Sequence, residues 1–276
     1  MRFTKMQGLG NDYIYVNAFE EGISDPASTS RMISDRHTGV GADGLILIQP
    51  SKLADVRMEM YNADGSRGMM CGNGIRCVAK YAVERGLTTG PTVRIETDSG
   101  VKLAECEYNG GRINRVRIDM GSPRLRISEI PARLPVEKAV DFPLRVNGAV
   151  HLITCVSMGN PHAVVFVDSL DVIDLPRVGP ELENAPEFPD RVNAHFVVVE
   201  SPSCVRMKTW ERGSGATRAC GTGACAVCVA GVLTGRTGRR IVAQLPGGEL
   251  ELEWRSDDHV MMSGEAVEVF NGEWKP

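Results

Sequence analysis

The chain has 276 residues, of which 42 % are hydrophobic and 24 % are charged, and its formal net charge is −4. This composition excludes a disordered or fibrous protein, and the negative charge without Lys/Arg runs argues against a nucleic-acid partner. The longest apolar stretch, 224–233, is too short to span a bilayer, and the first residues lack the apolar segment of a secretory signal, so we expect a cytoplasmic protein with reduced thiols.

Short strand-like runs are the commonest pattern along the chain. Several of them alternate apolar and polar residues, as half-buried strands do. The expected strands cover residues 45–48, 93–96, 116–119, 163–167, 196–199 and 250–254.

Helical patterns are fewer, and two of them follow directly after a cysteine. We expect helices over 26–36, over 74–85 ending at Gly86, and over 223–234 ending at Gly235, where glycine suits a left-handed cap. The last helix is apolar nearly all round, which predicts burial inside the surrounding sheet. The helix over 74–85 keeps Arg76, Lys80 and Arg85, so we expect it to be buried along most of its length, with its polar ends reaching solvent.

The first half of the chain recurs 149 positions later. The matches, none of which needs a gap, are Cys71-Gly72-Asn73-Gly74 with Cys220-Gly221-Thr222-Gly223, Tyr61-Asn62 with Trp210-Glu211, Gly86 with Gly235, and Gly10-Asn11 with Gly159-Asn160. We therefore predict an α+β protein of two pseudo-symmetric domains, each a curved mixed or antiparallel sheet around a central helix. The expected domains are 1–117 with 264–276, and 118–263, with the boundary in the Pro-rich stretch between Met120 and Pro143.

Three interpretations of the cysteines compete. Cys225 and Cys228 have metal-ligand spacing, but they lie in an apolar helical run without a second Cys-x-x-Cys or a His pair. Burial as small hydrophobic side chains accounts better for them, and the same holds for Cys77, Cys106, Cys155 and Cys204. The other two interpretations concern Cys71 and Cys220, which could form a functional disulfide or could transfer protons.

Proton transfer follows from the position of both cysteines directly before a Gly-x-Gly turn and a helix. A thiol there faces unpaired N–H groups and the positive end of the helix dipole, which lower its pKa and favour the thiolate. The same N–H groups bind a carboxylate. With the two halves face to face, one thiolate would remove an α-proton while the opposing thiol protonates the other face. Neither a metal nor a redox cofactor is required.

Other candidate features have weaker functional interpretations. Residues 39–44 match a dinucleotide fingerprint, but a strand-like run follows them instead of a helix. His162 could be an ordinary turn histidine, and Glu211 with Arg212 could form a plain surface salt bridge. We expect the remaining histidines to be structural or surface residues; they are His37, His151, His195 and His259.

The chain resembles the diaminopimelate epimerase family over essentially its whole length. The motifs that carry the resemblance are 5–13 (Lys-Met-Gln-Gly-Leu-Gly-Asn-Asp-Tyr), Asp35-Arg36-His37 with 39–44, 61–66, Cys71 to Cys77, 157–162, Trp210-Glu211-Arg212-Gly213, 219–224 and Leu245-Pro246-Gly247-Gly248. The resemblance implies a cofactor-independent enzyme, without pyridoxal phosphate, that interconverts LL- and meso-2,6-diaminopimelate for lysine and cell-wall biosynthesis. It also implies a homodimer and an active site in the cleft between the two domains.

The resemblance also implies roles for individual residues. Cys71 and Cys220 match the acid–base pair, and His162 and Glu211 match residues that assist the protonation changes of the thiols. Gly72-Asn73 and Gly221-Thr222 match the segments that bind the reacting carboxylate. The substrate-contacting positions are Asn11, Asn62, Asn160, Asn193, Glu211 and Arg212, of which Arg212 offers a planar fork for a distal carboxylate.

Four positions depart from the family pattern: Gly44 stands where some members carry glutamine, Ala194-His195 replaces a more usual pair, and Trp210 stands where tyrosine is commoner. They lie close to the expected distal end of the site. A racemase for another amino acid on the same fold is therefore the nearest alternative. A thiol-based redox or binding protein is the alternative from a different class.

Overall fold

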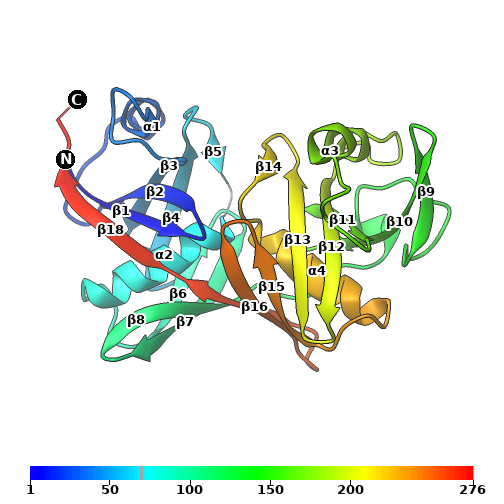
Figure 1. The fold of residues 1–276 in the computed structure, drawn as a ribbon. Helices are drawn as coiled ribbons and strands as arrows, with labels where there is room; N and C mark the ends of the chain where they lie inside the picture. Colours follow the sequence, from blue (N-terminus) through cyan, green and yellow to red (C-terminus); the bar gives the residue numbers. More distant parts are fainter. Residues whose placement is uncertain (69–70, 276) are drawn as a thin grey trace. The chain divides into compact units, whose positions relative to one another are not determined.

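The computed structural model describes residues 1–68 and 71–275. The chain divides into two compact units: unit 1 is Met1–Asp119 with Ser263–Pro276, and unit 2 is Met120–Met262. In both units many strands accompany two α-helices (Figure 1). The fold is therefore α+β, as the sequence predicts.

Unit 1 is a sheet built around one long helix. Its elements are β1 (Arg2–Gly8), β2 (Asn11–Asn17), α1 (Pro26–Ser34), β3 (Gly44–Gln49), β4 (Val56–Asn62), β5 (Arg67–Gly68), α2 (Gly72–Glu84), β6 (Thr92–Thr97), β7 (Gly100–Asn109), β8 (Arg112–Asp119) and β18 (Val267–Glu273). The pairs β1–β2, β3–β4 and β6–β7 are antiparallel, whereas β2–β3 and β4–β6 are parallel. The C-terminal strand β18 pairs with β1.

Unit 2 repeats this plan. Its elements are the 3-10 turn η1 (Ile127–Glu129), β9 (Phe142–Val146), β10 (Ala149–Ser157), β11 (Pro161–Phe166), α3 (Leu175–Glu183), β12 (Asn193–Ser201), β13 (Cys204–Glu211), β14 (Gly215–Thr217), α4 (Gly221–Leu233), β15 (Arg240–Leu245), β16 (Gly248–Trp254) and β17 (Val260–Glu265), within which the unit boundary falls. The pairs β10–β11, β12–β13 and β15–β16 are antiparallel, and β11–β12 and β13–β15 are parallel. The order of pairing types is that of unit 1.

The repeat extends to the bounds of the helices. Both ends of α4 lie 149 residues after those of α2, and both ends of α3 lie 149 residues after those of α1. Each of the six expected strands coincides with a strand. The two expected inner helices begin two residues earlier than predicted, at Gly72 and Gly221, and α3 is a helix that the sequence patterns did not predict.

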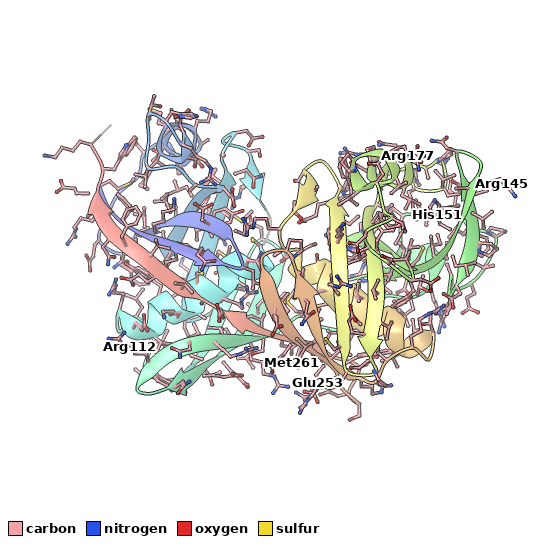
Figure 2. The ribbon with its side chains drawn as sticks, in the orientation of Figure 1. Arg112, Arg145, His151, Arg177, Glu253 and Met261 are labelled. Atoms are coloured by element: carbon pink, nitrogen blue, oxygen red, sulfur yellow. The ribbon has the colours of Figure 1, made fainter. Side chains whose placement is uncertain are left out.

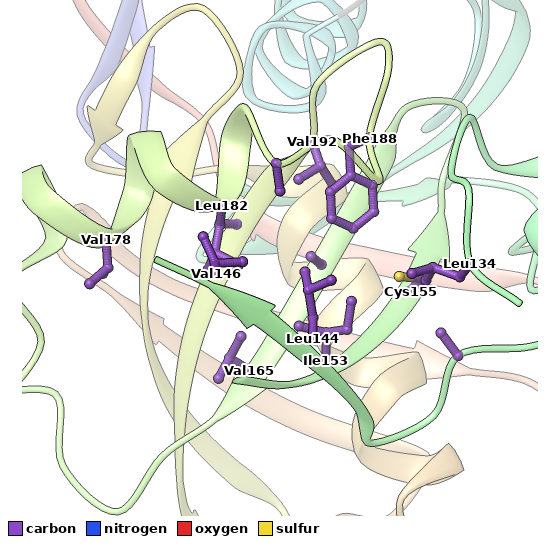
Figure 3. Close-up of a cluster of buried hydrophobic side chains, with 14 of the residues drawn as sticks. Leu134, Leu144, Val146, Ile153, Cys155, Val165, Val178, Leu182, Phe188 and Val192 are labelled. Carbon is purple, nitrogen blue, oxygen red and sulfur yellow. The ribbon is translucent and has the colours of Figure 1, made fainter. Parts of the chain in front are cut away.

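Each long helix is enclosed by the strands of its own unit. Helix α2 contacts β1, β2, β4, β6, β7 and β8, and α4 contacts β10, β11, β12, β15 and β16. Unit 2 also has a second core on the face of its sheet that α3 covers, where side chains such as Ile153, Leu182 and Phe188 pack together (Figure 3). Burying such side chains is the main stabilising contribution to each unit.

The buried part of α2 includes an arginine. Arg76 has no exposed surface, and its Nε and Nη1 donate to the carbonyl oxygens of Glu265 and Gly72 at 3.1 and 3.2 Å. The expectation that this polar residue reaches solvent is therefore wrong. The guanidinium joins the start of α2 to the returning C-terminal segment, and its burial lowers its pKa. Within the described residues, no helix is long and apolar enough to cross a membrane.

Candidate active site

The two cysteines that the repeat singles out occupy the same backbone position in their units. Cys71 is the N-cap of α2 and Cys220 is the N-cap of α4, and φ is −126° at both. This extended residue directly precedes a helix whose first N–H groups have no partner within the helix. Each sulfur therefore lies at the positive end of a 13-residue helix.

In unit 1 the sulfur contacts a side-chain amide and a backbone N–H group. Cys71 Sγ is 3.1 Å from Asn11 Oδ1 and 3.3 Å from the backbone N of Gly74. Asn11 also donates from its Nδ2 to Asp43 at 2.7 Å. The pKa of the neighbouring Tyr13 is raised by its burial and then by the nearby Cys71. Asn11 is thus held from two sides, with its oxygen toward the sulfur.

Other predicted residues of unit 1 lie on the elements around α2. Asn62, at the end of β4, donates from Nδ2 to Ser66 Oγ at 2.9 Å. Asn73 is buried in the first turn of α2, and no partner of its Oδ1 lies among the described residues. Gly44 fits only as glycine in this backbone, because a Cβ there would lie 2.1 Å from the carbonyl oxygen of Tyr61.

In unit 2 the sulfur is buried against a carboxyl group. Cys220 is 4 % exposed, and its Sγ lies 3.7 Å from Thr222 Oγ1. Burial, and after it the charge of Glu211, raises the pKa of Cys220 well above its ordinary value. The expected lowering of the thiol pKa is therefore wrong for Cys220. At this site desolvation outweighs the helix N-terminus.

Glu211 is an electrostatic partner of Cys220. Burial raises the pKa of this carboxyl, against the opposing effects of its bonds to Thr217 and Cys220. The Thr217 hydroxyl donates to Glu211 Oε1. A buried thiol and a buried carboxylate that influence each other's pKa form a pair through which one proton can pass.

The strand end that carries Glu211 and Arg212 is fixed by Glu183 of α3. This buried carboxylate accepts from Trp210 Nε1 at 2.7 Å, from the backbone N of Gly213 at 2.9 Å and from Arg191 Nη1 at 3.0 Å. Three donors on one carboxylate hold the segment 210–213 on both sides of Glu211. Sequence reasoning missed Glu183, because its function depends on the unpredicted helix α3.

Asn193 and Arg212 are brought together at the neighbouring strand ends. The backbone N of Arg212 donates to Asn193 Oδ1 at 3.0 Å, and Asn193 Nδ2 donates to the carbonyl oxygen of Pro161 at 2.8 Å. Arg212 Nη1 donates to the carbonyl oxygen of Asp190 at 2.9 Å. The guanidinium is only partly buried, and it has five N–H donors, so it keeps donors for an anion.

His162 lies in a buried polar cluster. Its ring has no exposed surface, its Nε2 is 2.9 Å from Asn160 Oδ1, and its Nδ1 is 2.9 Å from His195 Nε2. Burial lowers the pKa of both histidines, that of His195 to about 3. His195, expected to be a structural or surface residue, is therefore a buried partner of a predicted site residue.

The other histidines differ in their exposure. His37 is exposed, and His259 is partly exposed. His151 lies on β10, where Figure 2 labels it in the same part of unit 2 as Arg177, and its pKa is lowered chiefly by burial.

The structure thus groups most predicted residues within their units. Asn11 contacts Cys71 beside Gly72 and Asn73, whereas Asn62 bonds to Ser66. In unit 2, Glu211 and Thr222 contact Cys220 beside Gly221, and the pairs Asn160–His162 and Asn193–Arg212 form. Tyr13 was missed, although it is the repeat equivalent of His162. Among the residues described, no group of three or more His, Cys, Asp and Glu could hold a metal ion.

Comparisons by sequence identify one family. The family model described as diaminopimelate epimerase matches residues 3–126 and 154–269. Proteins named diaminopimelate epimerase from Desulfovibrio desulfuricans and Acetivibrio thermocellus are each 50 % identical to this chain, covering 99 % of it and 98 % of their own length. The protein of the same name from Pelotomaculum thermopropionicum is 51 % identical, with 99 % of both chains covered.

Solved structures share the fold at low sequence identity. A phenazine biosynthesis protein of the PhzF family from Bacillus anthracis has a TM-score of 0.72 at 16 % identity, covering 100 % of this chain and 99 % of its own. A hydroxyproline epimerase from Agrobacterium vitis has a TM-score of 0.69 at 17 % identity, covering 99 % of this chain and 90 % of its own. These likenesses establish the duplicated two-domain fold.

Proposed function

Because this chain belongs to the diaminopimelate epimerase family, we propose that Cys71 and Cys220 are the two acid–base groups of a cofactor-independent epimerase. The enzyme interconverts LL- and meso-2,6-diaminopimelate. The observation that carries the proposal is the equivalent position of the two thiols as N-caps of α2 and α4. A pair of single-proton groups is what inversion at one carbon requires.

The proposed reaction removes one proton and supplies another. The thiolate takes the α-proton, so that the C–H bond breaks, an S–H bond forms and the electron pair is delocalised into the carboxylate. The opposing thiol then gives its proton to the other face of the carbon, and its sulfur becomes the thiolate. The backbone N–H groups at Gly72-Asn73 and Gly221-Thr222 would hold the carboxylate and stabilise its developing charge.

In this proposal Cys220 has a carboxyl group as its proton partner. Cys220 exchanges its proton with Glu211, whose pKa is raised by burial toward that of the thiol. His162 already uses both ring nitrogens, toward Asn160 and His195. Its assistance to the thiols would therefore pass through Asn160, which is one of the proposed substrate contacts.

The proposed substrate contacts include the distal end of the molecule. Asn11, Asn62, Asn160 and Asn193 offer amide donors and acceptors, and Arg212 can bind a second carboxylate through its planar fork. We also propose that the enzyme acts in the cytoplasm, as a homodimer, in lysine and peptidoglycan precursor biosynthesis. Light scattering of the purified protein tests the dimer.

Conversion of LL- to meso-diaminopimelate, followed by chiral chromatography, tests the function. We expect Cys71→Ala and Cys220→Ala each to lose roughly 10²–10⁴-fold in kcat. Cys204→Ala, a matched thiol on β13 outside the site, should keep the wild-type rate. Normal turnover by either single site variant would sink the two-thiol scheme.

A substrate panel separates the alternatives. Amino acids with and without a second carboxylate should differ in KM, and Arg212→Lys should reduce that difference because lysine cannot bind a carboxylate through two parallel bonds. Epimerisation of a monocarboxylic amino acid in preference to diaminopimelate would instead identify a racemase of other specificity. Absence of any α-proton exchange, with a reversible thiol oxidation, would favour the redox interpretation.

A further inference from the structure

A row of four polar side chains crosses the sheet of unit 2 beneath α4. Thr209 on β13 stands directly opposite His195 on β12, and its Oγ1 is 3.0 Å from His195 Nδ1. The row continues from His195 Nε2 to His162 Nδ1 at 2.9 Å and from His162 Nε2 to Asn160 Oδ1 at 2.9 Å. Thr209 and both rings are at most 2 % exposed, whereas Asn160 is partly exposed.

Packing alone does not require a histidine at position 195. The repeat places Ile46 at the equivalent position of unit 1, and Ile46 is also fully buried. Both residues lie against the first turn of the central helix, where a Cβ on Gly74 would meet Ile46 at 2.8 Å and a Cβ on Gly223 would meet the His195 ring at 2.2 Å. An isoleucine fills this place in one unit, so the imidazole of the other unit is there for its hydrogen bonds.

Each ring in the row acts as one donor and one acceptor. Burial lowers the pKa of both histidines, so both are neutral, and a neutral imidazole carries a single N–H. The four groups therefore form a directed chain, and two directions are conceivable. Either the Thr209 hydroxyl donates and the amide oxygen of Asn160 accepts, or every bond runs the opposite way and Asn160 donates from its NH₂ group.

The Thr209 hydroxyl decides between these directions. Within the described residues, the only side-chain hydrogen-bond partner of this hydroxyl is His195 Nδ1. If His195 donated to Thr209, the buried hydroxyl proton would have no acceptor, and such a group costs the full desolvation penalty. If Thr209 donates, every N–H and O–H of the row is satisfied. His195 then carries its proton on Nε2, and so does His162.

From this direction we propose that His195 is a positioning residue: acting through His162, it holds the Asn160 amide oxygen inward and leaves the NH₂ group of Asn160 to donate to a carboxylate oxygen of the substrate. This inference rests on the proposed function, in which Asn160 contacts the substrate. An amide turned the other way would present an oxygen, which repels a carboxylate. The Asn160 amide could otherwise point either way. The row thus restricts it to one orientation.

Nitrogen NMR of the histidine rings tests the direction of the row without reference to activity. In protein labelled with ¹⁵N-histidine at neutral pH, we expect both His162 and His195 to be protonated at Nε2 and unprotonated at Nδ1. The signals are assigned by comparison with variants of each histidine. A proton on Nδ1 of either ring, or a charged ring, would overturn the proposal.

Two variants of His195 then test the positioning. His195→Ile supplies the side chain that unit 1 has, and it leaves His162 Nδ1 without a donor, so the ring is no longer held against Asn160. We expect KM for diaminopimelate to rise about tenfold, the effect of losing one hydrogen bond to a charged group, with a much smaller change in kcat. His195→Gln, whose side-chain NH₂ can donate to His162 Nδ1, should restore most of the KM and the Nε2-protonated signal of His162.

The outcomes separate the two proposals. If the wild-type protein shows no epimerisation, the proposed function fails, whereas the NMR result still decides the direction of the row. If the wild type epimerises and His195→Ile keeps both the wild-type KM and the wild-type His162 signals, the positioning role of His195 fails alone. Should His195→Ile not fold, the wild-type spectrum and His195→Gln carry the test, and a raised KM for the glutamine variant despite a retained Nε2 proton would contradict it.

Discussion

Unit 1 and unit 2 place a cysteine at the same cap of the same helix, yet they surround the two sulfurs differently. Cys71 lies beside the neutral amide of Asn11 and is partly exposed, whereas Cys220 is buried against the carboxyl group of Glu211. A duplicated backbone therefore does not give duplicated chemistry. The helix N-terminus is common to both sites, and the side chains on the neighbouring strands decide what each thiol does.

The differences are concentrated at a few equivalent positions. Asn62 of unit 1 corresponds to Glu211 of unit 2, Tyr13 corresponds to His162, and Ile46 corresponds to His195. At two of these positions unit 2 has an ionisable side chain, Glu211 or His195, where the side chain of unit 1 does not ionise. The backbone bounds of the helices are unchanged by these substitutions. Substituting one unit toward the other therefore tests what each difference contributes.

Glu211→Gln removes a charged side chain that has no charged equivalent in unit 1. We expect this substitution to have the largest effect on activity. Without a carboxylate to exchange protons with, Cys220 loses its acid–base partner, and we expect kcat to fall by roughly 10²–10⁴-fold. Steady-state assays with diaminopimelate measure this loss. Glu200→Gln, which alters an exposed ion pair with Arg206, is the matched control and should leave kcat unchanged.

The same variant should be more stable than the wild type at neutral pH. Because burial raises the folded-state pKa of Glu211 above its ordinary value of 4.5, ionisation lowers stability as the pH rises through that range. Glutamine does not ionise, so the gain in Tm should be present at pH 7 and absent below pH 4. An equal gain at both pH values would show that charge is not the cause.

Ile46→His places the unit 2 residue in unit 1, where its partners are absent. The equivalent neighbours there are Met60 on the adjacent strand and Tyr13, so the row of unit 2 cannot form. We expect a loss of about 3 kcal/mol or more in the free energy of unfolding, because a polar ring is buried and an apolar side chain is lost. Ile46→Val, which removes one methylene, should cost only about 1 kcal/mol. Similar losses for both variants in denaturant titrations would contradict this reason.

Replacing Gly223 or Gly74 with alanine should have the smallest effects on stability. The loss of stability should differ between the two units. A Cβ on Gly223 would lie 2.2 Å from the His195 ring, whereas a Cβ on Gly74 would lie 2.8 Å from the terminal methyl of Ile46. We expect Gly223→Ala to cost about 1–3 kcal/mol. Gly74→Ala should cost less, because the methyl can move and alanine favours the helix by up to about 1 kcal/mol. A larger stability loss for Gly74→Ala than for Gly223→Ala in thermal unfolding would contradict this explanation.

The repeat accounts for most of what the sequence could predict about the fold. The offset between Cys71 and Cys220 placed both inner helices, and the apolar alternation located the six strands. The start of each helix was missed by two residues, because Gly72 and Gly221 suggested a turn. Helix α3 was missed because Pro176 and Pro180 mask its pattern. The offset itself would have found it, since Asp174 is the repeat equivalent of the N-cap Asp25.

The properties that could not be predicted depend on burial across the sheet. The raised pKa of Cys220 follows from desolvation, which a helix-dipole argument alone does not include. Arg76 and Lys80 look alike on a helical projection, yet only packing with the C-terminal segment makes Arg76 fully buried. His195 gains its partners through the register of β11, β12 and β13, and no local pattern records that register.

Deuterium labelling during turnover tests the two-thiol account most directly. With LL-diaminopimelate in D₂O, the account predicts that newly formed meso product carries one solvent deuterium at the inverted carbon, while the remaining LL substrate stays unlabelled at early times. This follows because one thiol removes the substrate proton and a different, solvent-exchanged thiol supplies the other. Mass spectrometry of the separated isomers gives both values. Product that retains the original proton would mean that a single group removes and returns it, and would contradict the account.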